Sequence, residues 1–274
     1  MQARRLPALR GGQWIIDGFR LYRRNPPLLT LLALNYWLSI LLIFVFSSAF
    51  LSLFPAPVYR LLGPFPAVIL VQGLLVSVMN GCAAIEAGRK LGIDMLWSGF
   101  ARNRSALLRL GLLYLVGERI AALILFLLHG DVPVVQFGAA EGESAQMTID
   151  REQLLLTVLT WLGLSLPLTL AFWFAPMLAA WHDLPARKAL FFSVVAMLRN
   201  WRAFVAYGAG ALLLTVVLPA LAQLLFAFSD ALLTLASAAI TIAMVLVAMP
   251  TLFASIYASY RDVIGEDVQA EAGD

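Results

Sequence analysis

Charged residues are scarce in this chain of 274 residues: Asp, Glu, Lys and Arg together make up 13% of it, whereas hydrophobic residues make up 62%. A typical soluble domain is about 25% charged and about 45–50% apolar. A soluble fold of this length could not bury so much apolar surface. The composition therefore excludes a cytosolic enzyme and a disordered protein, and it indicates that lipid is the solvent of this chain.

Cysteine and histidine are almost absent, which removes most catalytic and metal-binding chemistry. The single cysteine, Cys82, cannot form an intramolecular disulfide. His129 and His182 fall at the ends of two different apolar runs, on opposite sides of the expected membrane, so they cannot share a metal ion. No H-E-x-x-H, phosphate-binding glycine loop or nucleophile elbow occurs. We expect a protein that is not an enzyme and has no catalytic residue, metal site or cofactor.

Long hydrophobic runs dominate the rest of the sequence. A membrane-spanning helix needs about 20 largely apolar residues, and five intervals between charged residues are long enough. A sixth run contains Arg109, Glu118 and Arg119, but the loop charges require it to cross as well. We predict an all-α, polytopic membrane protein with a single transmembrane domain over residues 1–264, six spans at about 27–54, 64–86, 107–129, 153–180, 203–228 and 231–259, and a short acidic cytoplasmic tail over 265–274.

The charges of the connecting segments set the expected orientation. Residues 1–26 carry six basic residues and one acidic residue, and residues 88–106 and 181–202 each carry four basic and one acidic. Residues 129–153 carry five acidic residues and one basic residue. Short loops rich in Lys and Arg stay on the cytoplasmic side. The pattern predicts that both termini are cytoplasmic and that the acidic segment lies outside.

The three basic cytoplasmic segments resemble one another, and each precedes a pair of spans. We predict three repeated units, each an amphipathic helix followed by a helical hairpin. The alternative is that each Arg-Asn pair is only the positive flank of a span. The matching positions are Gly18-Phe19 with Arg24-Asn25, Gly99-Phe100 with Arg102-Asn103, and Ser193-Val194 with Arg199-Asn200.

The helices before the first two Arg-Asn pairs have one aromatic, apolar side and one charged side. This pattern is typical of a basic helix that lies half-sunk among lipid headgroups. We expect these helices to fix the tilt of the spans, and contact with anionic lipid is the alternative function of their charges. The predicted interfacial anchors are Trp14, Phe19, Arg20, Arg23, Trp97 and Arg102.

Polar residues inside the spans are the best candidates for a site. Ionisable groups at membrane depth cost at least about 2.5–3.5 kcal/mol each, so they usually face a cavity or a partner. Glu118 and Arg119 are adjacent and therefore about 100° apart around the helix, which is poor geometry for pairing with each other. Each is expected to find a partner among the polar groups of other spans. These are Asn35, Gln72, Asn80 and Gln223.

Two interpretations of these polar groups stay open: a buried network that holds the bundle together, or a substrate or proton site. Glu86 lies close to the cytoplasmic end of its span. We expect it to contact Arg89 or Lys90 just beyond that end.

Three stretches resemble a family of uncharacterised integral membrane proteins of proteobacteria. The resemblance implies a multi-pass protein of the bacterial inner membrane and no particular chemistry. The stretches are residues 3–26, with Gly18-Phe19-Arg20-Leu21-Tyr22-Arg23-Arg24-Asn25-Pro26; residues 174–181, followed by Arg199-Asn200-Trp201; and Tyr257-Ala258-Ser259-Tyr260-Arg261-Asp262.

These observations favour a non-enzymatic inner-membrane protein with a scaffold, assembly or envelope-homeostasis role. Its expected partners are the lipid bilayer, including anionic lipids, and another membrane protein or a second copy of the chain, but not nucleic acid. The alternative function is a small permease or lipid-handling transporter that uses a polar site around Glu118 and Arg119.

Overall fold

The computed structural model describes residues 4–54, 65–89, 92–130 and 151–265, and all regular structure within these ranges is helical. The predicted acidic loop, for residues 131–150, and the predicted tail, for residues 266–274, lie outside the described residues. Six helical stretches are long and apolar enough to cross a membrane, which confirms the all-α, six-span prediction. They are Pro26–Leu51, Ile69–Glu86, Arg104–His129, Leu155–Trp181, Trp201–Leu225 and Asp230–Ile264.

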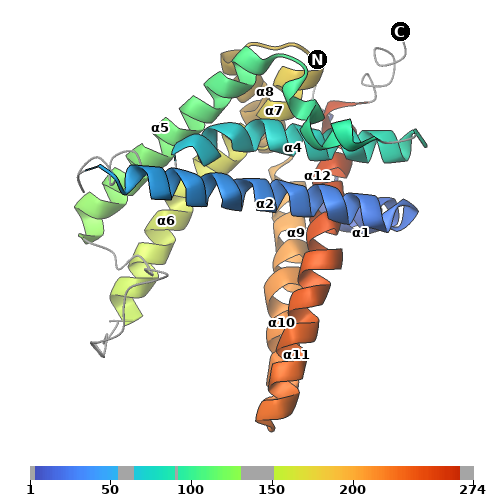
Figure 1. Cartoon of the computed structure of the whole chain (residues 1–274), viewed down its shortest axis with the longest axis vertical. Coiled ribbons are helices and arrows are strands. Elements are labelled where there is room, and N and C mark those ends of the chain that lie inside the picture. The colour runs from blue at the N-terminus through green and yellow to red at the C-terminus, as the bar shows by residue number, and fades with distance from the viewer. Residues whose placement is uncertain (1–3, 55–64, 90–91, 131–150, 266–274) are drawn as a thin grey trace.

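The first third of the chain contains α1 (Arg10–Arg24), α2 (Pro26–Leu51) and α4 (Phe65–Glu86), shown in blue to teal in Figure 1. Asn25 separates α1 from α2 because its side chain accepts a hydrogen bond from the Leu28 amide and so caps the second helix. Pro26 suits the first position of α2, where no backbone donor is needed. The basic helix and the first span are therefore two helices with a sharp junction.

The middle third begins with η1 (Ile93–Phe100), a short 3₁₀ helix, followed by α5 (Arg104–His129), α6 (Arg151–Phe172) and α7 (Ala175–Trp181). The helix breaks between α6 and α7, where Pro176 stands in the first turn of α7. Proline cannot donate the backbone hydrogen bond that would continue α6. The fourth span therefore consists of two helices in sequence.

The last third holds two π-helical turns, each of which ends just before a proline. Pro250 lacks an amide hydrogen, and its ring displaces the carbonyl four residues earlier, that of Leu246. This carbonyl accepts hydrogen bonds from the hydroxyls of Tyr22 (2.9 Å) and Thr30 (3.1 Å) instead. The elements are α8 (Ala186–Arg199), α9 (Trp201–Leu212), η2 (Leu213–Val217), α10 (Leu218–Leu225), α11 (Asp230–Ala243), η3 (Met244–Ala248) and α12 (Met249–Ile264).

The three short helices that precede the hairpins pack in the same way. Each lies against the closing helix of the preceding hairpin: η1 against α4, α8 against α6 and α7, and α1 against α12. The first unit thus packs on the last, and the contacts run in a closed cycle. This recurrence is what three repeated units would produce, and the repeat itself stays a prediction.

A small residue stands at the centre of each of these three contacts. A Cβ atom added to Gly18 would lie 2.6 Å from the backbone of α12, and one added to Gly99 would lie 2.0 Å from that of α4. Ser193 instead donates a hydrogen bond to one backbone carbonyl and accepts one from an amide, both 3.0 Å long. The partner residues, always four apart, are Thr251 and Ser255, Gly73 and Ser77, and Leu170 and Phe174.

The buried core lies where these short helices meet α4, α7 and α12. Trp14, Phe174 and Tyr260 are among its largest side chains and are almost fully buried. Figure 1 shows α9, α10 and α11 running together away from this core, toward the bottom of the view. The protein therefore has one densely packed end and at least one hairpin that has few protein neighbours.

Candidate functional site

Glu118 and Arg119 lie on α5 and are half-buried. The Glu118 carboxylate interacts with the hydroxyl of Tyr114, one turn earlier, and with the guanidinium of Arg119. The buried Nε of Arg119 has no hydrogen-bond partner among the described residues. Tyr114 and Arg119 both lie on the same helix as Glu118, and a partner for the Glu118–Arg119 pair on another span stays a prediction.

Asn80 joins three elements and has no contact with this pair. Its side-chain oxygen accepts a 2.7 Å hydrogen bond from Trp181 Nε1 on α7, and its amide donates a 3.0 Å bond to Ser98 Oγ on η1. Asn35 similarly donates to the Leu96 carbonyl, 3.3 Å away on η1. Gln72 is buried on α4. Asn80 and Asn35 therefore connect α4 and α2 to η1 and α7 without Glu118 or Arg119, and a polar network that includes that pair stays a prediction.

Glu86, at the end of α4, has its partners on α12. Its carboxylate accepts a 2.7 Å hydrogen bond from the hydroxyl of Tyr257 and forms an ion pair with Arg261. The prediction of a contact with Arg89 is wrong, since α4 packs against α12 and the ion pair forms there; Lys90 lies outside the described residues. Glu86 thus connects the first unit to the last.

Asp262 forms a second such connection, which sequence reasoning missed. It accepts hydrogen bonds from Arg10 Nε (2.5 Å) and from Trp14 Nε1 (2.8 Å), both on α1. The hydrogen bond to Asp262 raises the pKa of Arg10 above its ordinary value, so the guanidinium stays charged. The only signal in the sequence was that Asp262 ends one of the stretches that carry the family resemblance.

The predicted anchors differ in exposure. Trp14 is fully buried and packs against Phe204 on α9, with ring centroids 5.0 Å apart, because α9 and α12 cover α1. Its prediction as a headgroup anchor is wrong. Phe19 and Trp97 are 42% and 53% exposed, which leaves them free to contact lipid. Their anchoring role stays a prediction.

Two of the predicted basic anchors already have acidic partners. Arg20 pairs with Asp17 at 3.0 Å, and Arg102 pairs with Asp183 at 3.1 Å. Both arginines are more than half exposed, and surface pairs of this kind contribute at most about 1 kcal/mol. Arg23 is exposed. The positive charge that α1 and the segment after η1 offer to lipid is therefore partly neutralised within the protein.

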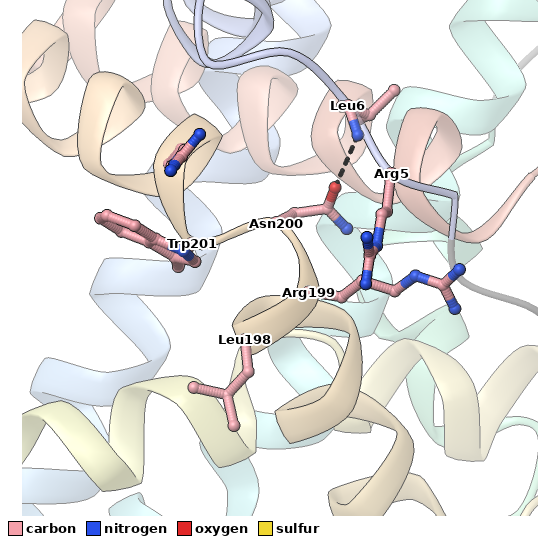
Figure 2. A pocket seen from close by; sticks show the side chains of 7 residues that line it. Arg5, Leu6, Leu198, Arg199, Asn200 and Trp201 are labelled. Atoms are coloured by element: carbon pink, nitrogen blue, oxygen red, sulfur yellow. Dashed lines mark hydrogen bonds between the residues drawn. The ribbon is translucent and has the colours of Figure 1, made fainter.

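A pocket of about 430 Å³ lies between the N-terminal segment and the junction of α8 with α9. Its residues are not among the predicted sites, although Arg199-Asn200 belongs to the repeated Arg-Asn pattern. Figure 2 shows Arg5 and Arg199 on one side of Asn200 and Trp201 on the other. The lining residues are Arg5, Leu6, Leu198, Arg199, Asn200, Trp201 and Arg202.

Metal binding finds no support in the part of the chain that the structure describes. No group of three or more His, Cys, Asp or Glu side chains there is placed to hold a metal ion. Cys82 is buried in the core. The basic pocket and the Glu118–Arg119 pair are therefore the two candidate sites.

These features define a multi-pass, all-helical membrane protein. It has six apolar helices, short basic segments, and one compact end held together by hydrogen bonds and ion pairs between helices. The chain is 33% identical over 276 aligned positions to a probable inner membrane protein of Burkholderia thailandensis, in an alignment that covers 97% of this chain and 94% of the relative. The chain belongs to the same family of inner membrane proteins. No protein-family model and no solved structure matches it.

Proposed function

We propose that this inner membrane protein is a non-enzymatic scaffold or assembly factor, with both termini in the cytoplasm. The proposal rests on the contrast between the densely packed end of the protein and the exposed hairpins that extend from it. The polar bridges of Glu86 and Asp262 tie the first unit to the last and hold one end rigid. The long hairpins beyond it present apolar helix faces that no other described helix covers.

The exposed hairpin faces are suited to contacts with other membrane helices. Helices associate in lipid mainly through close packing, which small residues permit. Gly208 and Ala209 on α9 and Ala239 on α11 are exposed, and a Cβ added to Gly208 would have no atom within 4 Å. The partner would be another membrane protein or a second copy of the chain.

A photo-crosslinking amino acid at Ala209 or Ala239 tests the scaffold role in intact cells. We expect the crosslinker at Ala209 on α9 and the crosslinker at Ala239 on α11 each to give one discrete protein adduct, and we expect both adducts to contain the same partner protein. The control is the same residue at Leu38, an exposed position on α2 of the first hairpin. Lipid adducts alone at all three positions would contradict the proposal.

The cytoplasmic placement of the termini rests on the loop charges and on one contact. The Arg4 amide donates a 2.9 Å hydrogen bond to the Val263 carbonyl, so the chain enters and leaves the packed end at the same place. Periplasmic reporters fused after Glu143 should be active, and cytoplasmic reporters should be active after Arg102 and after Ala270. A cytoplasmic signal at Glu143 would contradict this topology.

A lipid-handling or permease role is the second candidate, because Glu118 and Arg119 place two ionisable groups within a span and the Arg119 Nε has no hydrogen-bond partner in the described part of the chain. Replacing Glu118 by Gln preserves hydrogen bonding but removes the charge. The scaffold role predicts that E118Q melts normally and complements a deletion strain. Transport predicts a normally folded E118Q protein that fails to complement. Y114F is the matched control, since it removes the Glu118 contact and leaves the carboxylate in place.

A further inference from the structure

The pocket at the junction of α8 and α9 concentrates positive charge. Three of its seven lining residues are the arginines Arg5, Arg199 and Arg202, and none of the seven is acidic. Within the described ranges, none of the three forms an ion pair, whereas Arg10, Arg20, Arg102 and Arg261 all do. A group of guanidinium ions gathered without a carboxylate is stabilised by an anion from outside the chain.

The pocket wall is held in place by the side chain of Asn200, which is only 2% exposed. Its oxygen accepts a 2.9 Å hydrogen bond from the Leu6 amide, and its nitrogen donates a 2.9 Å bond to the Arg4 carbonyl. The backbone on both sides of Arg5 is therefore fixed beside Arg199, although 194 residues separate the two ends of the Leu6 bond. Figure 2 shows this bond. The fold therefore brings the Arg5 segment and Arg199 to the same pocket.

The end of α8 and the start of α9 meet at this pocket. Arg199 is the last residue of α8 and Trp201 is the first residue of α9, so free carbonyls of one helix and free amides of the other lie at the same junction, and the two helix dipoles oppose each other. The positive potential of the pocket therefore comes from its arginine side chains.

The position of the pocket along α9 indicates where its anion comes from. The candidate span Trp201–Leu225 begins at the pocket, so the pocket lies where the apolar face of the helix starts. Trp201 is 56% exposed and has the guanidinium of Arg202 over its ring at 5.4 Å, an arrangement suited to the membrane interface. Val205, one turn further, is 61% exposed. An acyl chain can follow this face from a headgroup held in the pocket.

We propose that this pocket binds the phosphate of an anionic phospholipid headgroup, with Arg5 and Arg199 as its donors and the α9 face, where Arg202 lies over Trp201, against the acyl chain. The proposal does not depend on the scaffold function. A lipid fixed here anchors the N-terminal segment, the end of α8 and the start of the fifth span to the same leaflet.

The test uses the full chain in micelles with phosphatidylglycerol or phosphatidylcholine added, and counts retained lipids by native mass spectrometry. We expect phosphatidylglycerol to be retained in preference to phosphatidylcholine. The variant R5Q/R199Q should bind phosphatidylglycerol about tenfold more weakly, because each lost charge-assisted bond weakens binding strongly. The charge-matched control R104Q/R187Q, which changes two exposed arginines outside the pocket, should bind within about twofold of the unchanged protein.

Three outcomes would overturn the proposal. Equal weakening in both double variants would mean that only net charge attracts the lipid. Equal retention of the two lipids would remove the anionic preference. Displacement of the lipid by glycerol phosphate at the same concentration would identify a site for a free anion. If R5Q/R199Q does not fold, the single variant R5Q replaces it, since Arg5 is exposed and its side chain is not part of the core.

Discussion

The α4 span and the last hairpin are equally suited by length and composition to cross a membrane, but their surroundings are opposite. In the most apolar part of α4, 61% of the residues are buried within the protein, compared with 6% in each of the two spans of the last hairpin. Lipid chains are as apolar as leucine, so both environments accept the same side chains. An apolar run therefore identifies a span and does not show whether protein or lipid surrounds it.

Both regions contain small residues, but these residues have different neighbours. On α4, Gly73, Ser77 and Gly81 follow at intervals of four, and a Cβ on Gly73 or Gly81 would collide with Phe100 or Leu32. Ser77 accepts a 2.9 Å hydrogen bond from the Gly99 amide. Gly208 in the last hairpin has no such neighbour. Small residues allow close packing only where the fold supplies a second helix.

The strongest test of this contrast replaces one leucine in each region. Leu74 on α4 is 1% exposed, and Leu221 on α10 is 51% exposed. L74A should lower the free energy of unfolding by about 2–4 kcal/mol, because it leaves a cavity. L221A should change it by no more than about 0.5 kcal/mol. Unfolding of both variants in the same detergent, followed by circular dichroism, gives the comparison, and equal losses would mean that the hairpin is packed as tightly as α4.

A smaller effect is expected when a methyl group is added at the contact of α1 with α12. The new Cβ of G18A would meet backbone atoms of α12, which cannot rotate away, so we expect a loss of about 1–3 kcal/mol. G12A in the same helix is the control, since a Cβ there meets no atom within 4 Å and alanine favours a helix. The melting temperature of G18A should therefore be lower than that of the unchanged protein, and the melting temperature of G12A should be equal to or higher than that of the unchanged protein. A stable G18A would show that α1 does not pack this closely.

The smallest loss of stability is expected when a charged acceptor is removed at the packed end. D262N should cost about 1.5 kcal/mol, since Arg10 and Trp14 lose an ionised acceptor. D183N breaks the ion pair with Arg102, in which both side chains are more than half exposed, and should cost less than about 0.5 kcal/mol. Melting of both variants at low salt checks the ranking. A larger loss for D183N would mean that Asp262 does not connect α1 to α12.

The sequence predicts the features that depend on single segments. Five spans follow from uninterrupted apolar runs and the sixth from the charges of the loops on either side of it, and the short basic helices follow from their periodicity. What it does not predict is which segments meet. Trp14 and Trp97 belong to the same kind of amphipathic pattern, yet one is fully buried and the other is 53% exposed. Periodicity defines the face of a helix, and only the fold decides what covers that face.

For the candidate sites, too, the sequence does not predict which segments meet. Glu118 and Arg119 are found from the sequence because charge inside an apolar run is conspicuous. The basic pocket is not, since Arg5 and Arg199 are ordinary loop-flanking arginines until the Asn200 side chain brings their segments together. No local pattern encodes a contact between residues so far apart in the chain.

The bond between Trp14 and Asp262 also imposes an order on biogenesis. The two residues are 248 positions apart. At a synthesis rate of about 5–20 residues per second, α1 leaves the ribosome about 12 to 50 s before the carboxylate that receives its indole exists. During that interval α12 does not yet exist, so the face of α1 that packs on it in the finished fold has to be covered by lipid or by helices already made. α1 can therefore reach its final packing only after the last span has been synthesised.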